Sequence, residues 1–446
     1  EVFKVDKESQ APLAKVPFKL LNAEGKALHF TLGEDGRYRT SKEGADTFLT
    51  DAEGKATILY VPQGVLSLVE QPYAGYGVAA PVSVTISDEN IVTLPKIVTV
   101  ENEPLAVEIY KQDAYTKQPM AASFTLLDSA GKAVKLARMS DGTYRPADKA
   151  PATATDSADA ASLTTVETVD KLTLDGKTGK ARIEYLPQGK YQLKEDAVSG
   201  YITLTGIEFE LTSEHTKAQP LQFTVSNIPT RFLLEKQDGV TKQPLKGAKF
   251  KLTDEKGNVI KLVKQEDGTY HPAKQGETGI EVLELSGDKA QAVICYLPAG
   301  KVTVTEVEGP NGYSIAAPIA TEVGTEVVLH TALAAQTEDM KKHTIAETSL
   351  AVVDLPLALK ISKVHSKTQK PLAGAGFAIK AEGALSTPLR FTVKDGVYWY
   401  DPQGNVTTIQ AAGEQCTALI YGLPAGKYQI EETVVPANFF PAPPVA

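Results

Sequence analysis

The chain has 446 residues, of which 42% are hydrophobic, and it carries a formal net charge of −9. This length and composition indicate several domains with packed cores, and they exclude a disordered chain. The acidic charge disfavours a nucleic-acid partner and a basic membrane-binding patch, and no apolar run is long enough to span a bilayer. Two cysteines give no disulfide framework, and neither a signal peptide nor a sorting signal is recognisable. We therefore expect either a cytoplasmic protein or the trimmed ectodomain of a larger one.

Short runs of Val, Thr, Ile and Tyr, broken by Gly, Pro, Asn and Asp, predict an all-β chain. Three sequence elements recur in the same order, which is typical of tandem domains. The recurrence predicts four repeats, which span residues 1–104, 105–229, 230–356 and 357–446. Short joints that contain a Pro link the repeats and predict a semi-rigid string of domains.

The first element opens each repeat and reads KVDKESQAPL, KQDAYTKQPM, KQDGVTKQPL and KVHSKTQKPL. Its leading Lys precedes a Pro by eight residues in all four repeats, at Lys4, Lys111, Lys236 and Lys363. Alternate residues of a strand share a face, so Val107 and Ile109 lie on the same face as Lys111. The pattern therefore predicts an apolar strand face that ends in an ammonium group.

An Asp-Gly pair followed by x-Tyr comes next and predicts a hairpin with a two-residue turn. These pairs begin at Asp35, Asp141, Asp267 and Asp395. The second element follows, with a Glu eight residues after a Pro, at Glu70, Glu195, Glu306 and Glu432. In KYQLKE, Tyr191 and Leu193 share a face with Glu195, so this strand face ends in a carboxyl group.

The third element closes the first three repeats and reads TVENEP, TVSNIP and AVVDLP. It delivers Asn102, Asn227 and Asp354 to the end of a further apolar face. The fourth repeat has 14 residues after Glu432, whereas Asn102 and Asn227 each lie 32 residues after their Glu. We therefore expect the fourth repeat to lack its last strand, which leaves Lys363 and Glu432 without a third member.

Two repeats also carry inserts. Residues 147–168 are rich in Ala, Thr, Ser and Asp and predict a surface loop. Residues 320–349 are long for a loop and are expected to add strands or a short helix.

Simpler interpretations exist for any single polar position. A Glu on an apolar face is often a strand-end residue that reaches water, and a Lys often extends its amine to the surface. A buried Lys–Glu ion pair would explain two members of each set but not the third. The Asp that replaces Asn in the third repeat indicates that the shared requirement is a carboxyl-type carbon.

In combination, the K-x-D element and the pattern L-P-x-G-x-Y-x-L-x-E followed by Gly-Tyr resemble the collagen-adhesin B-type (Cna B-type) repeats of Gram-positive surface proteins and pilins. The resemblance covers the whole chain. It implies a tandem array of immunoglobulin-like, prealbumin-like β-sandwich domains. It also implies that a Lys on the first strand and an Asn or Asp on the last form an intramolecular isopeptide bond, assisted by a buried Glu. By position, the triads would be Lys4–Glu70–Asn102, Lys111–Glu195–Asn227 and Lys236–Glu306–Asp354.

Elementary chemistry agrees with such roles. Burial favours neutral forms, so it lowers the pKa of a Lys and raises the pKa of a Glu. A neutral amine is the nucleophile, and a protonated Glu can polarise the carbonyl and transfer a proton to the leaving group. Holding amine and carbonyl together supplies the effective molarity that amide formation needs.

We found no pattern for other chemistry. The six His are scattered, so no metal site or cofactor is expected, and no enzyme motif is present beyond this single-turnover self-modification. We expect a cell-surface structural stalk of an adhesin or pilin, extracellular and wall-anchored through a segment outside this chain, with other surface or pilin subunits as partners. The alternative is a module that binds a host glycan or extracellular-matrix protein through the inserts or through Trp399. Hairpin aromatics such as Trp399 usually pack against their own sheet.

Overall fold

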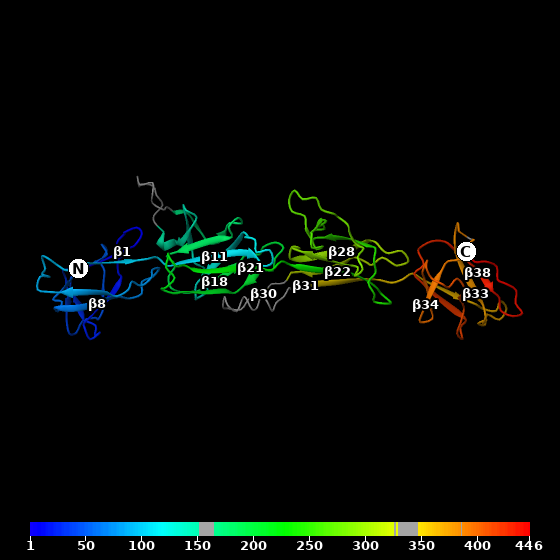
Figure 1. Ribbon diagram of the computed structural model, residues 1–446, viewed down its shortest axis with the longest axis horizontal. Coiled ribbons are helices and arrows are strands. Elements are labelled where there is room, and N and C mark those ends of the chain that lie inside the picture. Colours follow the sequence, from blue (N-terminus) through cyan, green and yellow to red (C-terminus); the bar gives the residue numbers. More distant parts are fainter. Residues whose placement is uncertain (151–164, 325–326, 329–346, 385) are drawn as a thin grey trace. The chain divides into compact units, whose positions relative to one another are not determined.

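The computed structural model describes residues 1–150, 165–324, 327–328, 347–384 and 386–446, and these form β-strands with one short 3-10 turn, η1 (Ala147–Lys149). The predicted all-β class is confirmed, and Figure 1 shows strands in every repeat. The described chain falls into two units, one holding the first two repeats and the other holding the last two. Most of the long insert expected at 320–349, and residues 151–164 of the other insert, lie outside the described residues.

Each of the first three repeats places its first and last strands side by side in one sheet and its Glu-bearing strand in another. In the first repeat the sheets run β10-β1-β6, β5-β2-β8-β9 and β3-β4-β7. Their strands are β1 (Val2–Asp6), β2 (Pro17–Leu21), β3 (Phe30–Leu32), β4 (Tyr38–Thr40), β5 (Phe48–Leu49), β6 (Lys55–Ala56), β7 (Ile58–Leu59), β8 (Gly64–Glu70), β9 (Val82–Ile86) and β10 (Val98–Asn102).

The second repeat has a six-stranded sheet β15-β13-β14-β17-β11-β21 and a four-stranded sheet β16-β12-β18-β20. Its strands are β11 (Ala106–Asp113), β12 (Ala122–Leu127), β13 (Leu136–Met139), β14 (Tyr144–Pro146), β15 (Thr165–Val169), β16 (Leu172–Leu174), β17 (Lys180–Glu184), β18 (Gly189–Glu195), β20 (Ile207–Leu211) and β21 (Leu221–Asn227). The short strands β19 (Leu204–Thr205) and β30 (Val327–Val328) pair in parallel.

The third repeat has sheets β24-β25-β27-β22-β31 and β26-β23-β28-β29. Its strands are β22 (Arg231–Asp238), β23 (Ala248–Thr253), β24 (Leu262–Lys264), β25 (Tyr270–Pro272), β26 (Leu283–Leu285), β27 (Gln291–Cys295), β28 (Gly300–Glu308), β29 (Ile319–Val323) and β31 (Glu347–Asp354).

The fourth repeat has sheets β32-β37-β35-β34 and β36-β33-β38. Its strands are β32 (Ala358–Ser362), β33 (Gly376–Ala381), β34 (Phe391–Lys394), β35 (Val397–Tyr400), β36 (Ile409–Gln410), β37 (Thr417–Tyr421) and β38 (Tyr428–Val434). Among the described residues, β32 pairs with β37 alone and is therefore a sheet edge.

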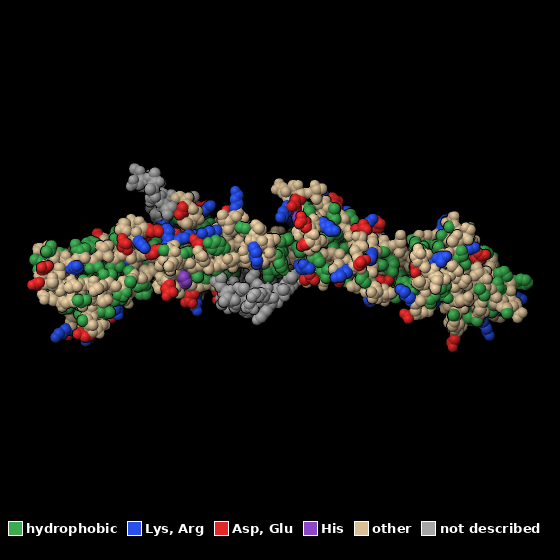
Figure 2. Space-filling model, in the orientation of Figure 1, with side chains coloured by type: hydrophobic (Ala, Val, Ile, Leu, Met, Phe, Trp, Pro, Cys, Tyr) green, Lys and Arg blue, Asp and Glu red, His purple; other side chains and the backbone are tan. Residues whose placement is uncertain are grey.

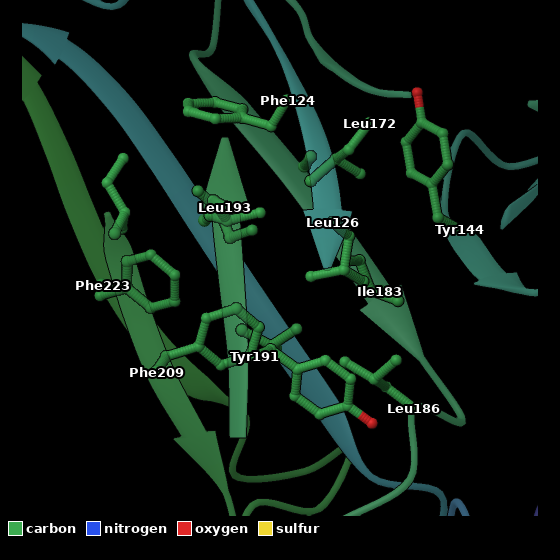
Figure 3. Packing of buried hydrophobic residues seen from close by; sticks show 14 of the residues in the cluster. Phe124, Leu126, Tyr144, Leu172, Ile183, Leu186, Tyr191, Leu193, Phe209 and Phe223 are labelled. Atoms are coloured by element: carbon green, nitrogen blue, oxygen red, sulfur yellow. The ribbon is translucent and has the colours of Figure 1, made fainter. Parts of the chain in front are cut away.

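Apolar alternation builds the cores, as Figure 3 shows for the second repeat. Phe124, Leu172, Leu193 and Ile183 have no exposed surface and converge between the two sheets. Because the side chains of a strand alternate between faces, the same alternation also turns Glu195 inward at the end of β18. The core-facing position of the polar residues thus follows from the strand period.

The Asp-Gly pairs connect antiparallel strands in all four repeats, but the predicted two-residue turn is right only in the fourth. There Asp395 and Gly396 alone separate the paired ends of β34 and β35, and both have positive φ. In the first repeat a loop of five residues separates the paired strand ends Leu32 and Tyr38, and Gly36 lies in this longer loop with φ +72°. Gly is needed in both loops, so the dipeptide alone did not reveal the loop length.

Within each unit the joint between consecutive repeats is tight. A Cβ added at Gly75 would lie 2.7 Å from the carbonyl oxygen of Tyr185, and one at Gly312 would lie 2.1 Å from that of Gly422. Glycine at these two positions lets the end of one repeat approach the backbone of the next. On the face shown in Figure 2, acidic and basic side chains are interspersed, in keeping with the modest net charge.

Candidate isopeptide cross-link sites

Parallel pairing of the first and last strands brings Lys and acceptor together in the first three repeats. Lys4 is the backbone partner of Val100, Lys111 of Val225, and Lys236 of Val352. The acceptor lies two residues further on, so it shares a face with that partner and points into the same core. All nine triad side chains are buried, and the three lysines are at most 1% exposed.

In the first repeat, the Lys4 amine donates to Asn102 Oδ1 and lies 3.1 Å from Glu70 Oε2. The amide of Asn102 in turn donates to Glu70 Oε1. In the second repeat, the Lys111 amine donates to Asn227 Oδ1 and lies 2.7 Å from Glu195 Oε1, which also accepts from Asn227 Nδ2 at 2.9 Å. Each Glu thus contacts both the amine and the amide.

The third repeat repeats this geometry with two carboxyl groups. The Lys236 amine lies 3.0 Å from Glu306 Oε2 and contacts Asp354 Oδ1. Burial raises the pKa of Glu306, with a further increase from its contact with Asp354. A protonated Glu beside an Asp removes the repulsion between two buried carboxylates.

Burial shifts Lys111 and Lys4 toward the neutral amine. Burial lowers the pKa of Lys111 to about 8, although the charge and hydrogen bond of Glu195 oppose the shift. Burial likewise lowers the pKa of Lys4 against the opposing effect of Glu70. The rings of Phe124 and Phe250 lie within 6.0 Å of the Lys111 and Lys236 amines and help to exclude water.

A family model described as the SpaA prealbumin-like fold domain matches four segments of the chain, residues 1–102, 106–224, 230–333 and 358–443. The chain belongs to the SpaA prealbumin-like fold domain family. It comprises four SpaA domains in tandem, which confirms the expected family and sandwich architecture. A search of curated proteins finds no match.

Solved structures similar to this SpaA chain include the Bacillus anthracis TIE protein, at 17% identity and a TM-score of 0.32, with 96% of this chain and 65% of that chain covered. A Streptococcal ancillary pilin matches at 17% identity and a TM-score of 0.26, over 80% of this chain and 98% of that chain. The shaft pilin SpaA from Lactobacillus rhamnosus GG matches at 16% identity and a TM-score of 0.24, over 57% of this chain and 98% of that chain.

The fourth SpaA domain holds an amine–carboxyl pair without an acceptor. The Lys363 amine lies 2.7 Å from Glu432 Oε1, and the Lys363 side chain is 12% exposed. Within the described residues, no Asn or Asp side chain contacts Lys363. Glu432 Oε2 accepts instead from the backbone of Ala442 at 2.7 Å.

Sequence reasoning overlooked an Asp that lies two residues after the triad Lys in each of the first three SpaA domains. Asp6, Asp113 and Asp238 are at most 4% exposed, and each accepts a hydrogen bond from a Tyr hydroxyl. The signal was the D of the K-x-D element, together with the Tyr of the Gly-Tyr pair. Strand alternation places this Asp on the Lys face but does not reveal its partners.

The remaining sequence candidates form no second site in the described residues. Trp399 packs edge-on against Tyr421 with ring centroids 5.2 Å apart, and the Tyr398 hydroxyl accepts from the backbone of Gln410 at 2.9 Å. The aromatic cluster therefore packs against its own SpaA domain. In the part of the chain that the structure describes, no group of three or more His, Cys, Asp or Glu could hold a metal, and no helix is long and apolar enough to cross a membrane.

Proposed function

We propose that this chain is a structural stalk of a Gram-positive surface protein or pilin, stiffened by self-formed bonds Lys4–Asn102, Lys111–Asn227 and Lys236–Asp354. The observation that supports this most is the threefold recurrence of a buried amine in contact with both an acceptor side chain and a Glu. A single ion pair could be structural, but it would not require the acceptor at the same register in three domains.

The reaction balances with the groups present. The neutral Lys amine attacks the side-chain carbonyl carbon of Asn, or of Asp in its acid form, while a protonated Glu donates a hydrogen bond to the carbonyl oxygen. As the tetrahedral intermediate collapses, Glu gives a proton to the leaving group and takes one from the attacking nitrogen. An amide bond forms, ammonia leaves from Asn or water leaves from Asp, and the Glu returns to its starting state. Each domain reacts once, so this is self-modification rather than turnover.

The placement of the bond explains why a stalk would use it. It joins the first and last strands of a domain, which are neighbours in one sheet. Pulling force enters a domain at the first strand and leaves at the last, so a covalent bond between them carries the load without unfolding the rest. We infer an extracellular position on the cell wall and other pilin or surface subunits as partners.

Intact-mass measurement tests the proposal. Each Lys–Asn bond removes about 17 Da and the Lys–Asp bond about 18 Da, so the protein should weigh about 52 Da less than its sequence requires. Lys111→Arg should reduce the deficit to about 35 Da, because Arg keeps the charge but cannot form the bond. A parent protein with the unmodified mass would contradict the proposal for all three domains.

A further inference from the structure

Three buried aspartates lie beside the acceptors rather than beside the reacting amines. In the parallel register, Asp6 is the backbone partner of Asn102, Asp113 of Asn227, and Asp238 of Asp354. Each carboxylate is therefore placed to act on the backbone around the acceptor.

One carboxylate oxygen fixes the loop that follows the first strand. Asp113 Oδ1 accepts from the backbone of Tyr115 at 2.7 Å and of Thr116 at 2.8 Å. The same loop begins at Ala114, whose backbone donates to the carbonyl of Asn227 at 2.8 Å. The loop is thereby tied to the backbone of the acceptor residue itself.

The first and third domains form the same two sets of hydrogen bonds, from the loop amides to the Asp and to the backbone carbonyl of the acceptor. Oδ1 of Asp6 accepts from Glu8 and Ser9 at 2.9 Å each, and Oδ1 of Asp238 accepts from Val240 at 2.7 Å and Thr241 at 2.8 Å. The loop amides then donate to the acceptor carbonyls, Lys7 to Asn102 at 2.8 Å and Gly239 to Asp354 at 2.7 Å.

The second carboxylate oxygen is held by a Tyr that follows the Glu in sequence. Tyr76 donates to Asp6 at 2.9 Å, Tyr201 to Asp113 at 2.9 Å, and Tyr313 to Asp238 at 2.6 Å. The backbone of each Tyr also bridges the Pro two residues past the acceptor, at Pro104, Pro229 and Pro356. The Asp–Tyr pair thus connects the Lys strand, the segment after Glu and the acceptor strand.

The ionisation states suit this bond. Burial opposes ionisation of Asp6, but hydrogen bonds from Ser9, Glu8 and Tyr76 lower its pKa overall. Burial, together with the charge of Asp6, raises the pKa of Tyr76, so the phenol stays a donor. A charged acceptor with a neutral donor forms one of the stronger hydrogen bonds available.

The Asp accepts hydrogen bonds both from the loop amides and from the Tyr hydroxyl, and the fourth domain retains only the first of these. There His365 takes its place, and its Nδ1 still accepts from the backbone of Lys367 at 3.1 Å and Thr368 at 3.2 Å. Phe439 replaces the Tyr and packs edge-on against the His365 ring at 5.5 Å. The hydrogen bonds to the loop amides and the Lys363–Glu432 contact are retained. The hydrogen bond from hydroxyl to carboxylate is absent in this domain, which holds no acceptor.

We propose that Asp6–Tyr76, Asp113–Tyr201 and Asp238–Tyr313 are positioning pairs that hold the acceptor carbonyl against the lysine amine. This rests on the proposed cross-linking function. The pairs restrain the acceptor strand at the residue that must approach within bonding distance. A small displacement of that carbonyl lowers the effective molarity of the amine steeply.

Tyr201→Phe in the full chain tests the inference, because it removes one hydroxyl and Phe already occupies this position in the fourth domain. Newly synthesised protein is quenched in denaturant at successive times, and linked and unlinked tryptic peptides are quantified. The Lys111–Asn227 bond should form at least about tenfold more slowly. The Lys4–Asn102 and Lys236–Asp354 bonds in the same molecules should form at their parental rates and serve as internal standards for the rate.

Two variants serve as controls. Tyr110→Phe removes another hydrogen-bonded hydroxyl from β11, which donates to Glu108 at 2.9 Å, and should leave the rate unchanged. Asp113→Asn keeps an oxygen for the loop and offers an N–H to the Tyr oxygen, so it should retain the rate within about threefold. Parental rates in Tyr201→Phe, or equal slowing in all three domains, would overturn the inference. A parent with no bonds would instead refute the proposed function.

Discussion

The second and fourth domains open with the same strand pattern but are completed differently. β11 is paired with β21 on one side and β17 on the other, and Val107 and Ile109 on it have no exposed surface. In the described part of the fourth domain β32 is paired with β37 alone, and Ile361, which corresponds to Ile109, is 8% exposed. Both domains nevertheless bring Lys and Glu to 2.7 Å.

This comparison shows that the Lys–Glu contact does not depend on the closing strand. The first strand and the Glu-bearing strand suffice to form the pair, as an ordinary buried ion pair would. The closing strand adds the acceptor and completes the burial of the amine. Ile430 of the fourth domain corresponds to Leu193 of the second. Leu193 belongs to the ladder that pairs β18 with β20, whereas Ile430 forms an isolated bridge with Val445. The proposed cross-link therefore depends on the acceptor, and experiments should separate the acceptor from the Lys–Glu pair.

Glu195→Gln should have the largest effect on linkage and stability, because it should leave the second domain without its cross-link, as in the fourth domain. Gln keeps the size of Glu and can still hydrogen-bond, but it cannot transfer the proton. Lys111 and Asn227, 116 residues apart, should stay unlinked, and by analogy with a disulfide the loss should cost about 4–5 kcal/mol of unfolding free energy. Peptide mapping and thermal unfolding measure both results.

The matched control is Glu210→Gln on the exposed face of β20, which should change neither linkage nor stability. The bonds in the first and third domains should persist in both variants. An intact Lys111–Asn227 linkage in Glu195→Gln would show that Glu195 is not the proton shuttle.

Amine labelling in denaturant should distinguish the four lysines completely. Lys363 should react fully, as should the exposed Lys117, because both carry free amines. Lys4, Lys111 and Lys236 should stay unlabelled, since an amide nitrogen is not nucleophilic. Peptide mass spectrometry after labelling measures the fraction modified. A peptide that joins Lys363 to another residue would contradict the predicted difference between the first three domains, which hold an acceptor, and the fourth.

The rate of bond formation in the second domain should rise with pH. Burial lowers the pKa of Lys111 to about 8, and the neutral amine reacts, so below this value the reactive fraction falls about tenfold per pH unit. The rate in newly made protein should therefore increase from about pH 6 to 8 and level off above it. Quenched time courses of the linked peptide measure it. A flat profile would mean that the proton stays within the Lys111–Glu195 pair.

Recurring motifs predicted the repeats, and a period of two predicted which polar side chains end each apolar strand face. Their grouping into triads followed from the family resemblance. The strand period could not predict that Asp113 bonds Tyr201, since that contact depends on how separate segments meet in space. The loop length around Gly36 was missed for a related reason, because a positive φ suits several turn types. The family model confirms the fold, whereas the bonds themselves remain predictions.

Tyr185→Phe should have the smallest effect and would test whether the joint between the first two domains influences the first triad. The Tyr185 hydroxyl donates to Asp6 Oδ2 at 3.1 Å, beside the shorter bond from Tyr76, and Arg145 stacks on its ring at 4.3 Å. Asp6 keeps Tyr76 and two backbone donors, so the loss should cost about 0.5–1.5 kcal/mol in denaturant unfolding. The joint between the last two domains has Gly422 at the corresponding position and works without a hydroxyl there. The Lys4–Asn102 bond should therefore still form at its parental rate in Tyr185→Phe, and slower linkage in the first domain would show that docking of the second domain helps to position Asn102.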